Sequence, residues 1–374
     1  MPTLARSDRS VLGHWWWTVD RWVLAAIVIL IGFGILLIQA STPAVAVKHG
    51  WSNFYFVERH LAMLVPALAV LFGASLLSPK KLRILSVVLL AVFLPLLIAT
   101  PFIGAEIKGA VRWIRVLGLF SIQPSEFIKP LFVVTAAWLF TRQCERRGFP
   151  GLSVNIFLYL TIVAALLMQP DIGMVFLVSA IWFGQFFLAG LPIAFIGISG
   201  AVGVAGMFVA YYSFPHFALR MDKFLSRTGD TYQVDRALNA FANGGLFGTG
   251  PGEGTVKMSI PDAHADFVFA VAGEELGLLW CLLIIGVFAF IVLRGLRRLN
   301  QENSLFVVLA VSGLLIEFGL QAVINLASTM RLIPTKGMTL PFISYGGSSL
   351  FALAFGMGML LALTRKRFGL GDED

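Results

Sequence analysis

Residues 23–40 read VLAAIVILIGFGILLIQA, an apolar run without a single charged residue. About 20 such residues are enough for a helix to cross the hydrocarbon core of a bilayer. Runs of this kind recur along the chain, so that 58% of its 374 residues are hydrophobic and only 13% are charged. They are unbroken and do not alternate as the strands of a membrane barrel do. We therefore predict an all-α, polytopic integral membrane protein.

About ten transmembrane helices fit the pattern of apolar runs, and both chain ends are short. The predicted spans are residues 23–40, 61–78, 84–100, 124–140, 153–169, 172–190, 193–212, 266–293, 305–327 and 347–364. This division predicts an N-terminal segment at 1–22, a single transmembrane domain at 23–364 and a C-terminal tail at 365–374. A large loop, residues 213–265, joins helices 7 and 8. An alternative reading of 21–46 as a cleaved signal peptide is disfavoured, because its apolar run is too long.

Lysine and arginine collect at every second junction, which predicts that both termini are cytoplasmic. The clusters are Arg6, Arg9 and Arg21; Lys80, Lys81 and Arg83; Arg142, Arg146 and Arg147; Arg294, Arg297 and Arg298; and Arg365, Lys366 and Arg367. On this orientation the 213–265 loop is outside, although it carries basic residues of its own. Long loops are translocated largely regardless of charge. Its cations, among them Arg220, Lys223 and Lys257, are therefore expected to bind an anionic ligand.

The net charge of +8 does not indicate a nucleic-acid partner, because no basic stripe is interleaved with aromatic residues. The two cysteines, Cys144 and Cys281, cannot form a disulfide framework or a zinc site on their own. No metal-ligand set stands out among the histidines and carboxylates. No cofactor is predicted with certainty, and assistance by a divalent cation remains open.

The first polar motif combines Arg112 with the stretch 123–130, QPSEFIKP. Glu126 and Lys129 are three residues apart, so on a helix they share a face and can pair. Ionisable residues inside a span are costly and face the protein interior. The pair is therefore either a structural ion pair that closes a helix end or part of a functional pocket.

The second motif is glycine-rich: residues 244–257 read GGLFGTGPGEGTVK and end at Lys257. It lacks the Gly-Lys-Ser/Thr ending and the strand–helix setting of a nucleotide-binding loop. We expect a tight, turn-rich lid or re-entrant loop. Its backbone amides are of the kind that can meet a pyrophosphate.

The third and fourth motifs are PDAHADFVFAVAGEELG at 261–277 and PTKGMTLPFISYGGSS at 334–349. Asp266 is expected to open the eighth helix from the outside, where a carboxylate is either a cap or a functional group. Lys336 and Ser344 lie among prolines and glycines that break a helix. Broken backbone at membrane depth is tolerated when it lines a cavity or is buried in protein, as in the discontinuous helices of transporters.

Together, and in this order, the four motifs resemble the SEDS family (shape, elongation, division and sporulation proteins), from about Asp20 to Arg367. The Thr335-Lys336-Gly337 form and the tryptophan-rich start are more similar to the division branch than to the elongation branch. The resemblance implies a peptidoglycan glycosyltransferase that polymerises lipid II, an undecaprenyl-pyrophosphate-linked precursor, on the outer face of the bacterial cytoplasmic membrane at the division septum. It also implies two kinds of partner, a class B penicillin-binding transpeptidase and the membrane proteins of the divisome.

By the same resemblance, the essential outer aspartate of the family corresponds to Asp266, the expected general base. The family motif usually reads Glu-Ala-His-Thr-Asp, so Asp262 and Ala265 are departures from it. The residues expected to bind substrate are Arg112, Glu126, Lys129, Arg220, Lys223, Lys257, Lys336 and Ser344. A lipid II flippase is the alternative function, and a non-enzymatic scaffold is a third. Because the polar motifs cluster on the outer side rather than along a whole crossing path, the enzyme is favoured.

Overall fold

The computed structural model describes residues 10–42, 50, 52, 54–107, 110–116, 120–145, 148–190, 197, isolated positions between 205 and 222, 232–334 and 337–366. Most of the predicted seventh span, 193–212, lies outside these residues, as does much of the 213–265 loop before residue 232.

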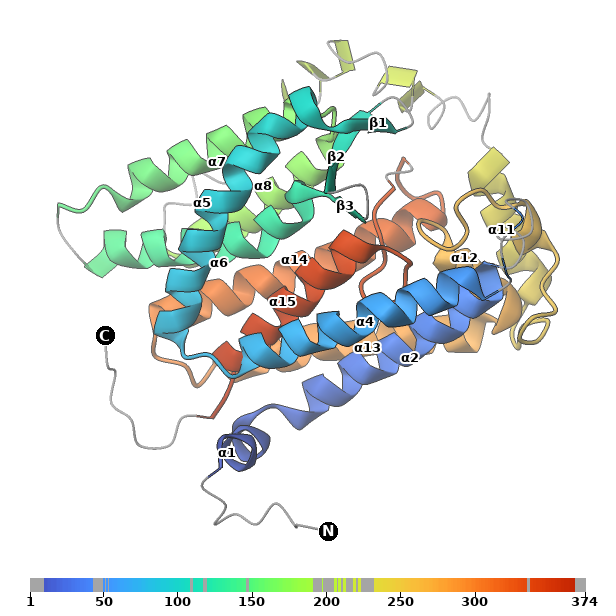
Figure 1. Ribbon diagram of the computed structural model, residues 1–374, viewed down its shortest axis with the longest axis horizontal. Helices are drawn as coiled ribbons and strands as arrows, with labels where there is room; N and C mark the ends of the chain where they lie inside the picture. The colour runs from blue at the N-terminus through green and yellow to red at the C-terminus, as the bar shows by residue number, and fades with distance from the viewer. Residues whose placement is uncertain are drawn as a thin grey trace.

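The described chain is an elongated bundle of long helices (Figure 1). They are α2 (Arg21–Ser41), α4 (Tyr55–Ser75), α5 (Pro79–Ile103), α6 (Pro124–Glu145), α7 (Gly151–Met168), α8 (Ile172–Leu188), α13 (Leu278–Leu299), α14 (Leu305–Thr329) and α15 (Gly347–Leu363). Six of them, α2, α4, α5, α7, α13 and α14, are long and apolar enough to cross a membrane. The two shorter apolar helices are α8 and α15. The prediction of a helical membrane fold with about ten spans is confirmed.

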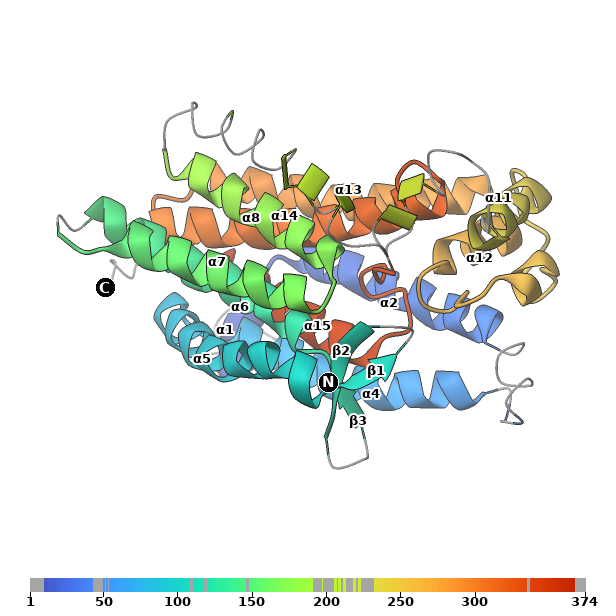
Figure 2. The same cartoon turned by 90° about the horizontal axis from the view of Figure 1, so that it is seen from above.

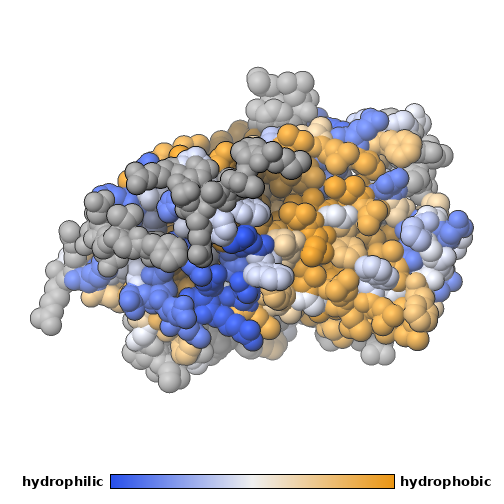
Figure 3. Space-filling view, turned by 90° about the horizontal axis from the view of Figure 1, so that it is seen from below, coloured by the Kyte–Doolittle hydropathy of each residue, from blue (hydrophilic) through white to orange (hydrophobic). Residues whose placement is uncertain are grey.

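Helices α6, α14 and α15 form the centre of the bundle, and the others surround them (Figure 2). In α14, 72% of the most apolar window is buried, against 22% in α5. The outer helices instead present apolar side chains at the surface, including Val65, Val88 and Phe157. Figure 3 shows a broad apolar face beside a hydrophilic region. A surface of this kind suits a helix bundle whose solvent is lipid.

Both ends of the described chain meet at one end of the bundle. The short helix α1 (Val11–Thr18) precedes α2, and the Arg365 Nε donates to the Thr18 hydroxyl at 2.9 Å. The Lys366 amide donates to the Thr18 carbonyl at 3.0 Å. Asp20 caps α2 and also accepts from Arg294 and Arg298 of α13, which fixes the start of the bundle to the end of a distant helix.

The eighth predicted span is wrong as a single helix. Residues 261–267 are turns, and a short helix α12 (Val268–Glu275) ends before α13 begins at Leu278. Gly277 separates the two helices with a φ of 84°, a backbone conformation that glycine adopts without strain. The prediction carried one span through Glu274, Glu275 and Gly277, although two carboxylates and a glycine interrupt the apolar run there.

The outer loops contain regular structure that the apolar pattern did not predict. Strands β1 (Ala105–Ile107), β2 (Ala110–Val116) and β3 (Phe120–Ile122) form a small antiparallel sheet in the order β1-β2-β3. Helix α11 (Tyr232–Gly244) and the 3₁₀ turn η1 (Val256–Ser259) lie within the long loop. The sheet contacts α5, α6 and α15, whereas α11 and η1 contact α12, the helix that follows Asp266.

Candidate functional site

Asp266 lies in a turn that is hydrogen-bonded to the loop before α15. The Ser344 hydroxyl donates to the Ala265 carbonyl at 2.6 Å, and the Tyr345 amide donates to the His264 carbonyl at 2.9 Å. Two segments about 80 residues apart in the chain, 261–267 and 337–346, therefore meet side by side. We call them the aspartate turn and the Gly337–Gly346 loop.

Helix α14 holds both segments through one amide side chain. The Asn325 Nδ2 donates to the Asp266 carbonyl at 3.0 Å and to the Met338 carbonyl at 2.6 Å. Asn325 is buried, so these bonds form in a protein interior where an unmade hydrogen bond is costly. The backbone of Asp266 is thereby fixed to a membrane helix.

Asp266 is partly exposed, and it precedes the N-cap position of α12 rather than occupying it. Helix α12 begins two residues later, with Phe267 as N-cap and no side-chain cap hydrogen bond. Gly337 stands directly against the carboxylate, since a Cβ at this position would lie 3.3 Å from the Asp266 Oδ2. The carboxylate thus belongs to a partly exposed residue and faces a residue without a side chain.

Four rings from three segments pack beside this turn. Phe56 of α4 lies 5.2 Å from His264 and 5.4 Å from Tyr345, between ring centroids, and His60 lies 6.1 Å from Tyr345. Burial raises the pKa of the Tyr345 phenol above its ordinary value, so the group is neutral at pH 7. The rings form an apolar wall that joins α4 to the aspartate turn.

Glu126 and Lys129 form the predicted ion pair at 2.9 Å, and the lysine side chain is only 1% exposed. The same ammonium donates to the Gln321 Oε1 of α14 at 2.8 Å. Lys129 was predicted to bind substrate, but its ammonium is buried and has two partners inside the bundle. Because a lone buried charge is costly, the pair and its amide partner act as one unit.

Arg112 holds a turn between two helices. Its guanidinium donates to the Pro170 carbonyl at 2.8 Å and to the Gln169 carbonyl at 3.3 Å, and it lies 3.6 Å from Asp171, the N-cap of α8. A guanidinium is planar and has several N–H donors, so it can contact two carbonyls and a carboxylate at once. Arg112 therefore connects the small sheet to the α7–α8 turn.

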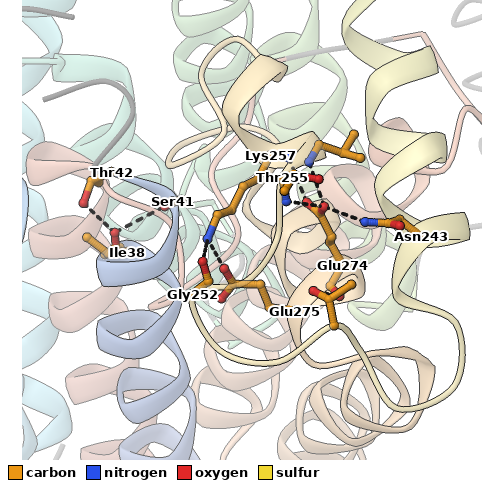
Figure 4. A network of polar contacts seen from close by, with 11 residues as sticks. Ile38, Ser41, Thr42, Asn243, Gly252, Thr255, Lys257, Glu274 and Glu275 are labelled. Carbon is orange, nitrogen blue, oxygen red and sulfur yellow. Dashed lines mark hydrogen bonds and ion pairs between the residues drawn. The ribbon is translucent and has the colours of Figure 1, made fainter. Parts of the chain in front are cut away.

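Lys257 is not the exposed loop cation that the sequence predicted. Its ammonium pairs with Glu275, and the two side chains are 4% and 2% exposed (Figure 4). The neighbouring Glu274 accepts from the backbone amides of Thr255, Val256 and Lys257 at 2.8–2.9 Å and from the Asn243 side chain at 2.9 Å. Both carboxylates of α12 therefore hold the outer loop in place.

The glycine-rich loop bridges the break between α12 and α13. The Thr249 and Gly250 amides donate to the Glu274 and Glu275 carbonyls at 2.9 and 3.0 Å. In return, the Leu278 amide donates to the Gly245 carbonyl at 3.0 Å. Amides that the sequence offered to a pyrophosphate are thus used to complete a broken helix.

The structure brings together Asp266 and Ser344 of the predicted site, and it places Arg112, Glu126, Lys129 and Lys257 in internal contacts. Ser344 is buried, and its hydroxyl also accepts from the Leu340 amide at 2.8 Å. Arg220, Lys223 and Lys336 lie outside the described residues. Among the residues that the structure describes, no group of three histidine, cysteine or acidic side chains is placed to hold a metal ion.

Sequence reasoning missed Gln321 and Asn325. Both lie in the predicted ninth span, four residues apart, which places them on one face of a helix. Uncharged amides within a long apolar run were a usable signal, because polar groups at membrane depth need partners.

A family model described as cell cycle protein, covering FtsW, RodA and SpoVE, matches residues 21–368. The probable peptidoglycan glycosyltransferase FtsW of Caulobacter vibrioides is 45% identical over 381 residues, which cover 99% of this chain and 97% of that protein. The protein of the same name from Trichlorobacter lovleyi is 35% identical, over 92% of this chain and 93% of that protein.

Two solved structures are similar throughout. A chain from a structure on the coordination of polymerization and crosslinking by a peptidoglycan synthase complex aligns with a TM-score of 0.77 and 26% identity, over 92% of this chain and 97% of that one. The rod shape determining protein RodA of Thermus thermophilus aligns with a TM-score of 0.67 and 25% identity, over 93% of this chain and 97% of that one.

Proposed function

The chain belongs to the cell cycle protein family of FtsW, RodA and SpoVE, and from this premise we propose that it is a peptidoglycan glycosyltransferase acting in cell division. It is a multi-pass membrane protein, and its FtsW relatives are named probable peptidoglycan glycosyltransferases. The proposed reaction is the polymerisation of lipid II into glycan strands on the outer face of the cytoplasmic membrane.

One observation carries the assignment of the catalytic group. Asp266 is a partly exposed carboxylate in a turn that is fixed on two sides, by Asn325 of α14 and by Ser344 of the Gly337–Gly346 loop. A general base must be held within reach of its proton, and general-base help contributes about 10²–10⁴ in rate. A carboxylate on a partly exposed residue whose backbone is fixed in this way meets that requirement.

In the proposed reaction, Asp266 takes the proton from the attacking sugar hydroxyl of one substrate. The hydroxyl oxygen forms a bond to the anomeric carbon of the other, and the bond from that carbon to the pyrophosphate oxygen breaks. The departing undecaprenyl pyrophosphate keeps the electron pair. Cations near the outer surface would stabilise its charge.

Fewer of the predicted basic residues now remain as candidates for binding the pyrophosphate. Lys129 and Lys257 are buried with internal partners, and Arg112 is bound to carbonyls of the α7–α8 turn. We propose that Arg220, Lys223 and Lys336 bind the pyrophosphate of the lipid II molecule whose bond breaks. A class B penicillin-binding transpeptidase and divisome membrane proteins are the proposed partners, at the division septum. The likeness to a chain of a peptidoglycan synthase complex supports a partner of this kind.

Polymerisation of purified lipid II by the protein in nanodiscs, with and without the transpeptidase, tests the function directly. Glycan strands that depend on Asp266 would support the enzyme. The flippase alternative predicts transfer of labelled lipid II across liposomes without strand formation, and that result would contradict the proposal.

A further inference from the structure

Gln321 of α14 stands between the buried ion pair and the Gly337–Gly346 loop. Its Oε1 accepts from the Lys129 ammonium at 2.8 Å, while its Nε2 donates to the Thr339 carbonyl at 3.1 Å and lies 3.3 Å from the Thr339 hydroxyl. The side chain is 1% exposed. A single buried amide thus spans from helix α6 to the loop beside Asp266.

The lysine determines which way this amide points. An ammonium has donors only, so the oxygen of the amide must face it. The two N–H groups are then directed to the other side, where the Thr339 carbonyl accepts. Glu126 holds Lys129 in position by accepting a hydrogen bond from its ammonium at 2.9 Å. The orientation of Gln321 therefore follows from the ion pair.

Further hydrogen bonds hold the loop on both sides of the Gln321 contact. Thr339 shares a hydrogen bond of 2.6 Å with Ser349 at the start of α15, and Met338 accepts from Asn325, which also binds the Asp266 carbonyl. Gln321 and Asn325 are one turn apart on α14, so they hold two successive loop carbonyls from one rigid helix. The loop includes Gly337, the residue against the Asp266 carboxylate.

We propose that Gln321 is a positioning residue of the glycosyltransferase, and that Lys129 acts on catalysis through Gln321 by fixing the Gly337–Gly346 loop against Asp266. The inference rests on the proposed function for its effect on turnover, but the positioning itself is a property of the unliganded protein. A displacement of about 1 Å at a reacting group can cost about a hundredfold in rate.

Two variants separate positioning from general stability. Gln321→Met removes both hydrogen bonds at similar length. Gln321→Glu keeps the acceptor for Lys129 but has no N–H for Thr339. The matched control is Gln185→Met, because Gln185 of α8 is similarly buried and donates to the Val133 and Leu309 carbonyls at 2.9 and 3.0 Å, which belong to α6 and α14 rather than to the loop.

The first measurement is hydrogen exchange in nanodiscs without substrate. Amides of the loop that are hydrogen-bonded, such as Leu340 and Tyr345, should exchange about tenfold faster or more in both Gln321 variants and remain unchanged in Gln185→Met. Unchanged loop exchange in Gln321→Glu would overturn the positioning role whether or not the protein is a glycosyltransferase. If Gln321→Met does not fold, the isosteric Gln321→Glu still decides.

The second measurement is lipid II polymerisation. Positioning predicts that kcat falls about 10–100-fold in both Gln321 variants, with KM changed by less than about threefold. Gln185→Met should retain its kcat. If Gln321→Glu were as active as the unmodified protein, the pairing of Lys129 would suffice and the link to the loop would be refuted. Suppose instead that loop exchange is faster in the Gln321 variants, but that neither the unmodified protein nor any variant polymerises lipid II. The positioning role would then stand, and the proposed function would be rejected.

Discussion

Gly337 lies so close to Asp266 that a Cβ at position 337 would come within 3.3 Å of the carboxylate Oδ2, and its φ of 55° belongs to the left-handed region. Gly337→Ala should therefore strain the backbone by about 1 kcal/mol and press a methyl group against the Asp266 carboxylate. We expect at least about a tenfold loss of kcat in lipid II polymerisation.

The control for this substitution is Gly286→Ala in α13, where an added Cβ meets nothing within 4 Å. It should leave turnover unchanged. Equal activity of the two alanine variants would show that the space in front of Asp266 is not needed.

Asp266→Asn preserves size and removes the basic carboxylate. Because asparagine has the size of aspartate and the N-cap position of α12 is held by Phe267, the variant should fold with little change in thermal stability and bind lipid II. It should polymerise lipid II at least about a hundredfold more slowly. Asp262→Asn is the matched control, since Asp262 adopts a φ of 53° that asparagine tolerates. Near-normal glycan synthesis by Asp266→Asn would reject the general-base assignment.

Lys257→Met should destabilise the protein by about 3–5 kcal/mol, because Glu275 would remain buried without its cation. Thermal unfolding in detergent measures the effect. Adding Glu275→Gln to the same chain should restore part of the loss. A Lys257→Met protein of unchanged stability with weakened lipid II binding would instead favour the original expectation of a substrate-binding cation.

Asp20 predicts a pH dependence at the end of the bundle where the two ends of the described chain meet. Burial alone raises the pKa of this carboxyl, but hydrogen bonds from Arg294 and Arg298 outweigh it, so the pKa lies below the ordinary value of 3.8. Its stabilising contribution is then complete above about pH 4 and disappears as the pH falls through the lower, folded-state pKa. The stability advantage over Asp20→Asn, followed by thermal unfolding, should shrink only below about pH 4. An advantage that is constant to pH 2 would contradict the pairing.

Orientation is tested with single cysteines in a chain lacking Cys144 and Cys281. Glu253 lies in the glycine-rich loop and Asn303 between α13 and α14, and both are exposed. In intact spheroplasts, an impermeant thiol reagent should label a cysteine at 253 and not one at 303. Equal labelling of the two positions would reject the predicted topology.

The helical membrane fold could be predicted because apolar runs of membrane length are a direct consequence of the solvent. The ion pair of Glu126 and Lys129 could be predicted because it is local on one helix. The close approach at the Gly277 break could not be predicted, because it involves the distant Gly248 backbone, whose amide nitrogen would lie 2.4 Å from a Cβ at 277. The burial of Lys257 also depends on a partner 18 residues away in another element.

Asp266 was identified by its motif, whereas Gln321 and Asn325 were not, and the reason is physical. A carboxylate at the edge of a membrane is conspicuous in a sequence. An amide inside an apolar helix acquires its role only when a loop from another part of the chain is placed against it.

The exchange of hydrogen bonds across the break between α12 and α13 has a mechanical consequence. The glycine-rich loop supplies donors to the last carbonyls of α12 and an acceptor to the first amides of α13, so lifting it away would strip hydrogen bonds from both helix ends at once. Independent movement of the loop as a lid is therefore disfavoured. We expect the loop to move together with α12 and α13 as one unit. A force applied to the outer loop would then be transmitted through α12 to the turn that bears Asp266.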